Sequence, residues 1–100
     1  MNNHKLRSDE VDELFDAVLS LKNREECYAF FEDLATIQEV NALAQRLQIA
    51  KRLYHDDGTY QNISSELGVS VSTIGRVKNS LTYGAGGYQT VLDRMKPPGK

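Results

Sequence analysis

Residues 70–80 contain short polar side chains and one arginine, spaced so that they would lie on one face of a helix. Apolar residues form the opposite stripe at three- and four-residue intervals, namely Val71, Ile74, Val77 and Leu81. The face that they leave open is uncharged apart from the arginine and carries Ser72, Gly75, Arg76 and Asn79. Such side chains can reach base edges and phosphates, and arginine is the commonest partner of guanine. This face therefore indicates recognition of double-stranded DNA.

A shorter helix and a glycine turn precede this face, in the layout of a helix-turn-helix. Ile63 and Leu67 share one side of the first helix, and Ser64 is small enough for a second helix to cross close to it. Gly68 is expected to end that helix, because glycine adopts the left-handed conformation without steric cost. Ser70 can accept hydrogen bonds from the free N–H groups of the next helix. The pattern predicts a helix-turn-helix over residues 59–81, although two short amphipathic helices around a glycine also form plain corners of helical bundles.

We expect the DNA contacts at the start of the first helix, at the cap of the second helix and along the second helix, from Gln61, Ser70, Val71, Ser72, Thr73, Gly75, Arg76, Lys78 and Asn79. The distribution of charge fits this placement better than the net charge of −2 does. Residues 1–40 carry four basic and ten acidic side chains, residues 41–81 five and three, and residues 82–100 three and one. The segment that contains the helix-turn-helix is therefore mildly basic, whereas residues 1–40 are acidic. This distribution suits a protein that contacts DNA phosphates only through the helix-turn-helix region. Chance asymmetry of a solvated surface is the alternative.

The composition argues against an enzyme, a metal site and a membrane protein. At 100 residues the chain makes one domain, too short for a catalytic cleft between lobes. His4 and His55 are far apart, with no clustered carboxylate or thiol near either, so no metal, catalytic residue or cofactor is expected. The first residues lack the apolar run of a signal peptide, and no segment approaches membrane-spanning length. We therefore expect a cytoplasmic protein without enzymatic activity.

Cys27 is the only cysteine, which excludes an intrachain disulfide and a cysteine-based zinc site and is typical of a reducing cytoplasm. Its spacing from Phe30, Phe31 and Leu34 places it on the same face of a helix. We therefore expect Cys27 to be a core residue.

The rest of the chain is predicted to be helical, with no long alternating pattern of a strand. Within residues 5–57, helices are expected over 9–21, 23–34 and 36–54, with caps at Asn23 and Thr36 and a stop at 55–58. Thr59 is expected to cap the helix that follows. The expected apolar face of the helix over 36–54 consists of Val40, Leu43, Ala44, Leu47, Ala50 and Leu53 or Tyr54. After a glycine-rich joint at 84–87, a last helix is expected over 88–96, stopped by Pro97 and Pro98. The sequence thus predicts a single all-α domain over 1–100, with dimerisation helices (5–57), the helix-turn-helix (59–81) and a C-terminal helix (88–96).

Dimerisation is expected because such short helices are marginal alone. Phe15, Tyr28, Phe30 and Phe31 form more aromatic surface than two small helices can shield between themselves. A homodimer would also match the two-fold symmetry of a palindromic operator. The alternative is that these aromatic residues form the core of a monomer.

Nearly the whole chain, residues 5–96, resembles the tryptophan repressor superfamily, in particular the small bacterial YerC/YecD-type regulators. The resemblance is most specific over residues 26–37, 43–47, 65–68, 72–78 and 81–84. It implies an all-helical, intertwined homodimer in which the N-terminal helices of two chains interlock and each chain presents one DNA-reading head.

The resemblance also implies a corepressor pocket. In tryptophan repressors two arginines sandwich an indole ring, with two threonines and a serine beside it, and the matching residues here are Thr36, Arg46, Thr73, Arg76 and Ser80. Guanidinium planes stack on rings and pair with carboxylates, so the set suits an amino acid. Val77, however, replaces a glycine that faces the ligand, and Gly75 replaces a threonine. Extra methyl groups in a close-packed site cost about 1–3 kcal/mol, so tryptophan is not the expected ligand.

We expect a transcriptional regulator that binds a palindromic DNA site as a homodimer. Two alternatives stay open. An unknown small-molecule effector near Arg46 and Arg76 could set the angle of the reading head, or the helix-turn-helix could bind a protein partner. Arg46 and Arg76 could also serve only surface ion pairs or phosphate contacts.

Overall fold

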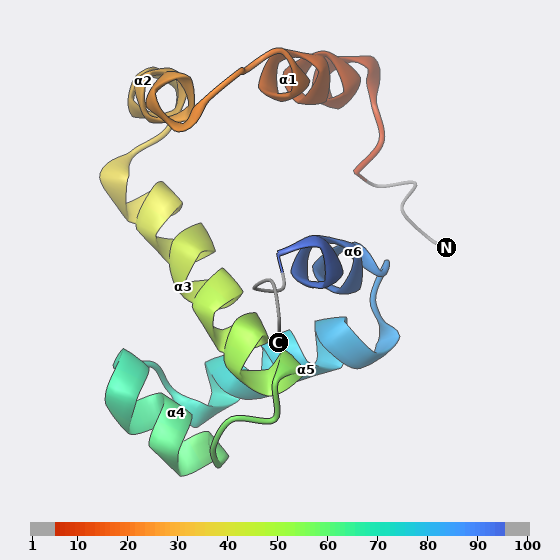
Figure 1. Ribbon diagram of the computed structural model, residues 1–100. Helices are drawn as coiled ribbons and strands as arrows, with labels where there is room; N and C mark the ends of the chain where they lie inside the picture. The colour runs from red at the N-terminus through yellow and green to blue at the C-terminus, as the bar shows by residue number, and fades with distance from the viewer. Residues whose placement is uncertain (1–5, 96–100) are drawn as a thin grey trace. The chain divides into compact units, whose positions relative to one another are not determined.

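The computed structural model describes residues 6–95 of the 100-residue chain, and it contains only helices in that range (Figure 1). In chain order they are α1 (Asp9–Leu19), α2 (Arg24–Leu34), α3 (Ile37–Tyr54), α4 (Tyr60–Leu67), α5 (Val71–Tyr83) and α6 (Gly87–Arg94). The predicted all-α class is confirmed. His4, the expected stop at Pro97 and Pro98, and positions 5 and 96 lie outside the described residues.

Two compact units make up the described chain. The first contains α1, α2 and the first turn of α3, up to Asn41, and the second begins at Ala42 and contains the rest of α3 with α4, α5 and α6. The expectation of one domain over residues 1–100 stays a prediction.

Side-chain caps set the helix boundaries of the first unit. Asn23 accepts a hydrogen bond from the Glu26 backbone N–H at 2.9 Å and thereby starts α2, as predicted. Thr36 and Glu39 form a reciprocal capping box, because the Thr36 hydroxyl accepts from the Glu39 N–H at 3.1 Å and the Glu39 carboxylate accepts from the Thr36 N–H at 2.9 Å. The first helix ends at Leu19, two residues before the predicted end.

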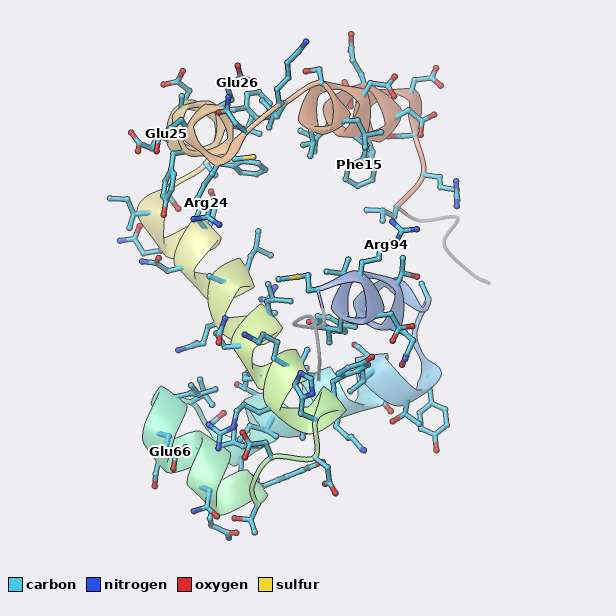
Figure 2. The ribbon with its side chains drawn as sticks, viewed as in Figure 1. Phe15, Arg24, Glu25, Glu26, Glu66 and Arg94 are labelled. Atoms are coloured by element: carbon cyan, nitrogen blue, oxygen red, sulfur yellow. The ribbon has the colours of Figure 1, made fainter. Side chains whose placement is uncertain are left out.

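No residue of α1 or α2 is buried. Phe15 is 48% exposed and projects from α1 (Figure 2), and Tyr28 is 60% exposed. The expectation that Cys27 is a core residue is wrong for the single chain, since its thiol is exposed. The physical reason is that the apolar stripe of α2 is only partly covered within the chain, since Phe30 and Phe31 are partly buried and Leu34 is exposed.

All four helices of the second unit contribute to one core of buried side chains, formed by Ile49 and Ala50 of α3, Ile63 of α4, Ile74 and Val77 of α5 and Leu92 of α6. The predicted apolar face of α3 is only partly correct. Leu43 and Ala44 are exposed, whereas Ile49, which the pattern did not select, is fully buried. The buried and partly buried residues of α3 in this core all lie in its C-terminal half.

Candidate nucleic-acid interface

The turn between α4 and α5 has the geometry that the sequence predicts. Gly68 adopts the left-handed conformation with φ 68° and ψ 39°, and its N–H donates to the Ser64 carbonyl at 2.9 Å. Ser64 does more than allow a close approach, because its hydroxyl donates to the Val69 carbonyl at 2.6 Å. The Val69 N–H donates back to the Ser64 carbonyl at 3.2 Å. These bonds hold the start of α5 in a fixed relation to the end of α4.

Both helices of the pair begin at side-chain caps. Thr59 accepts from the Asn62 N–H at 3.1 Å at the start of α4, and Ser70 accepts from the Thr73 N–H at 3.1 Å at the start of α5. The hydroxyls of Ser70 and Thr73 also lie 2.9 Å apart, within hydrogen-bonding distance. The predicted cap at Thr59 and the predicted cap at Ser70 are confirmed.

The reading helix α5 has one buried side and one open side. Ile74 is fully buried and Val77 is 4% exposed, whereas the open side carries Ser72, Arg76, Lys78, Asn79 and Ser80, all exposed. Val71 departs from the predicted apolar stripe, because it is 46% exposed at the first position of the helix. Of the other expected DNA contacts, Gln61 and Ser70 are exposed and Thr73 and Gly75 are partly buried. Their roles as contacts stay predictions.

Two glycines of this region differ in what surrounds them. A Cβ at Gly84 would lie 2.3 Å from the Ser80 carbonyl oxygen, so glycine is required where α5 ends. A Cβ at Gly75 would meet no atom within 4 Å beyond the backbone of its own helix. Packing of the described chain therefore gives no reason for glycine in the middle of α5, where it costs about 1 kcal/mol relative to alanine.

Of the five residues that matched a corepressor pocket, the two threonines form hydrogen bonds within the chain and the two arginines form no ion pair in the described part of it. Thr36 caps α3, and Thr73 contacts Ser70. Arg46 and Arg76 are exposed, and neither forms an ion pair with another side chain among residues 6–95. Ion pairing within the single chain is therefore not their role in this structure. Whether the five residues bind a ligand stays a prediction.

Two polar residues of α3 that the sequence pattern did not indicate contact the helix pair α4–α5. Arg52 lies 2.8 Å from the Glu66 carboxylate of α4, and Gln45 donates to the Leu67 carbonyl at 3.4 Å. Their spacing was the available signal, because positions 45 and 52 are two helical turns apart and lie on the side of α3 that contains Ile49.

A tyrosine on α3 fixes α6 to the same unit. The Tyr54 hydroxyl donates to the Asp93 carboxylate, and Gln89 donates to the same carboxylate oxygen at 3.1 Å. The hydrogen bond to Asp93 raises the pKa of Tyr54 above its ordinary value of 10.0, with smaller contributions from desolvation and from the negative charge.

Within the part of the chain that the structure describes, no three histidine, cysteine or acidic side chains are grouped to hold a metal ion. No described helix has the length and apolarity needed to cross a membrane.

The second unit therefore has the architecture of a helix-turn-helix DNA-binding regulator, with α5 as its reading helix. Comparisons with known proteins agree with this class. Residues 9–96 match the sequence profile of the Trp repressor protein family. The chain belongs to this family, whose members are regulators rather than enzymes.

Individual relatives cover nearly the whole chain. YerC of Bacillus subtilis, an uncharacterised protein, is 52% identical over 92 residues, which are 92% of this chain and 88% of YerC. The crystal structure of a candidate Trp repressor from Staphylococcus aureus has a TM-score of 0.87 and 53% identity, covering 95% of this chain and 94% of its own. A TrpR-like protein from Eubacterium eligens has a TM-score of 0.86 and 47% identity, covering 94% and 95%. The predicted resemblance to Trp repressor-type regulators is confirmed.

Proposed function

We propose that the protein regulates transcription by inserting α5 into the major groove of a palindromic operator, as a homodimer and without enzymatic activity. The observation that carries this proposal is the open side of α5, where exposed Ser72, Arg76 and Asn79 surround a glycine that the fold does not require. Gly75 would let the helix backbone approach the DNA closely. An operator lies on chromosomal DNA, so we also propose a cytoplasmic location.

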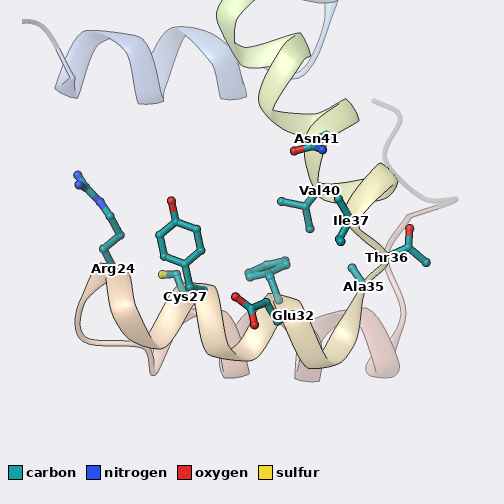
Figure 3. A pocket seen from close by; sticks show the side chains of 10 residues that line it. Arg24, Cys27, Glu32, Ala35, Thr36, Ile37, Val40 and Asn41 are labelled. Atoms are coloured by element: carbon teal, nitrogen blue, oxygen red, sulfur yellow. The ribbon is translucent and has the colours of Figure 1, made fainter.

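The first unit supports the homodimer. An open hollow of about 830 Å³ lies between α2 and the start of α3, lined in part by Cys27, Tyr28, Phe31, Ile37 and Val40 (Figure 3). Ile37 is 75% exposed, and exposed apolar surface of this extent is typical of a protein interface. A second copy of the chain would cover it, as the two-fold symmetry of a palindromic operator requires.

We further propose that DNA binding does not depend on tryptophan. Val77 is buried in the core of the second unit, together with Ile49, Ala50, Ile63, Ile74 and Leu92. Its side chain therefore fills space beside α5 that a smaller residue would leave for a ligand. An effector of another kind, contacting the exposed Arg46 and Arg76, is compatible with this packing.

Selection of an operator from random duplexes, followed by binding measurements across a range of salt concentration, tests the proposal. We expect a palindromic site, two chains per site, and a logarithmic affinity that falls linearly with the logarithm of salt, by about 0.9 for each phosphate neutralised. Enrichment of no sequence, together with binding to a protein partner, would favour the protein-interaction alternative and contradict the proposal.

A further inference from the structure

Arg52 lies near the end of α3 and bridges it to two other segments. Its Nε donates to the Asp57 backbone carbonyl at 2.9 Å and lies 3.4 Å from the Asp57 carboxylate. Its Nη1 lies 2.8 Å from the carboxylate of Glu66, which projects from the last turn of α4 (Figure 2). One guanidinium thus connects α3, the loop that follows it, and α4.

The loop is shaped around this side chain. The Asp57 N–H donates back to the Arg52 carbonyl at 2.8 Å, so the two residues are bonded in both directions. Gly58 has a positive φ of 103°, and a Cβ there would lie 3.0 Å from Arg52 Nη2. Glycine therefore provides both the backbone conformation and the room for the guanidinium. Only 21% of the Arg52 side chain is exposed, and two carboxylates already neutralise it, which makes a role as a free phosphate contact unfavourable.

Gln45 contacts the same helix from two turns earlier on α3. It donates to the Leu67 carbonyl at the end of α4, where backbone carbonyls lack partners within the helix. Ile49 lies between Gln45 and Arg52 on this side of α3 and is fully buried in the core. On this side of α3, a buried apolar residue is therefore flanked by two polar contacts to α4.

We propose that Arg52, assisted by Gln45, is a positioning residue for DNA reading. The two side chains fix α4 on α3, and the hydrogen-bonded turn at Gly68 passes this placement on to α5. The orientation of the reading helix then depends on residues that do not touch DNA. The effect on DNA reading rests on the proposed function. The contacts of Arg52 and Gln45 with α4, which we call the clamp, can be tested without DNA.

Arg52→Gln tests whether the clamp affects the preference for the operator. Lys51→Gln is the control, because it removes the same charge one residue away. Lys51 forms no ion pair with the other described side chains. We expect Arg52→Gln to lower the preference for the operator over a scrambled duplex about three- to tenfold, whereas Lys51→Gln preserves that preference. The salt slope of Arg52→Gln should equal that of the wild type. A slope smaller by about one, with equal losses on both duplexes, would identify a phosphate contact and overturn the positioning role.

Hydrogen exchange of the free protein tests the clamp. The α4 amides should exchange several-fold faster in Arg52→Gln than in Lys51→Gln, because local opening of α4 becomes easier. Glu66→Ala is a milder second variant. Alanine favours a helix and the change removes a negative charge from a helix C-terminus, so both local effects should slow exchange. Faster exchange of the α4 amides in Glu66→Ala would therefore indicate loss of the ion pair between Arg52 and Glu66.

Unchanged or slower α4 exchange in both Arg52→Gln and Glu66→Ala would overturn the clamp. Failure of the wild type to prefer any DNA sequence would instead overturn the proposed function, and the exchange measurement would still decide whether Arg52 holds α4.

Discussion

The proposal that tryptophan is not a ligand depends on one side chain, Val77. Val77 is 4% exposed and belongs to a core that also contains residues of α3, α4 and α6. Interiors of this kind are close-packed, so a planar ring beside α5 would have to displace the valine. Arg46 and Arg76 are exposed and free of ion pairs within residues 6–95, so their guanidinium groups are available to a ligand or to DNA.

Val77→Gly should therefore create weak tryptophan binding that the wild type lacks. Loss of three buried carbons and insertion of a glycine into α5 should cost about 3 kcal/mol of stability, which is more than helix propensity alone predicts. Calorimetry with tryptophan, at a temperature where circular dichroism shows the variant folded, measures the binding. Heat of binding with the wild type would contradict the steric account, and binding by neither protein would indicate that the arginines serve DNA or the dimer.

Helix α5 combines a required glycine at its end with an unexplained glycine in its middle. Gly75→Ala should raise the free energy of unfolding by about 0.5–1 kcal/mol, because alanine is the better helix former and a Cβ meets open space. Operator affinity should stay equal or fall, since the added methyl group separates the helix from DNA. Denaturant unfolding and binding assays measure the two effects. Greater stability together with tighter operator binding would show that Gly75 has no role in DNA approach.

The attachment of α6 to α3 should be visible in an alkaline titration. The Asp93 contact raises the pKa of Tyr54, so the folded state favours the neutral phenol. Its contribution to stability is complete below the ordinary pKa of 10.0 and is lost as the pH rises through the higher pKa of the folded state. Ultraviolet titration should show one of the five tyrosines ionising later than the others, and Asp93→Asn should bring it back toward them. An unchanged titration in Asp93→Asn would refute the assignment.

The boundaries of these helices were largely predictable from the sequence, because caps are local. Asn23, Thr36, Thr59 and Ser70 each start a helix where the pattern indicated. Ile49 was not predictable in this way, because its burial depends on which side of α3 the later helices cover.

The polar contacts of the reading pair, and the exposure of some apolar residues, escaped prediction for related reasons. Arg52 resembles an ordinary surface residue until the loop at 55–58 folds back on it. Cys27 fits the apolar stripe of α2, yet no element of the same chain buries it. Such residues depend on tertiary or intermolecular partners, which spacing along the chain does not identify.

The whole molecule combines a DNA-reading unit that has its own core with a first unit in which no residue of α1 or α2 is fully buried. A homodimer would bury the exposed apolar side chains of the first unit and set the spacing of two reading helices. The acidic excess of residues 1–40 also disfavours direct contact of the first unit with phosphates.

Ile37→Glu should weaken the dimer without unfolding the chain. Ile37 is 75% exposed and begins α3, where a negative charge is favourable to the helix dipole. Burying the new charge in an interface should cost at least about 2 kcal/mol, so sedimentation should show a shift from twice 11.3 kDa toward 11.3 kDa. Gln38→Glu, the same charge at the next position, is the control. Equal dimerisation of Ile37→Glu and wild type would place the interface elsewhere.

The affinity of Arg76→Ala for the selected operator and for a scrambled duplex tests most directly whether the open side of α5 reads DNA. We predict that the variant binds the operator about 1–3 kcal/mol more weakly than the wild type and loses preference at one base position, while its affinity for the scrambled duplex changes little. Unchanged operator affinity, with the fold intact by circular dichroism, would contradict the account.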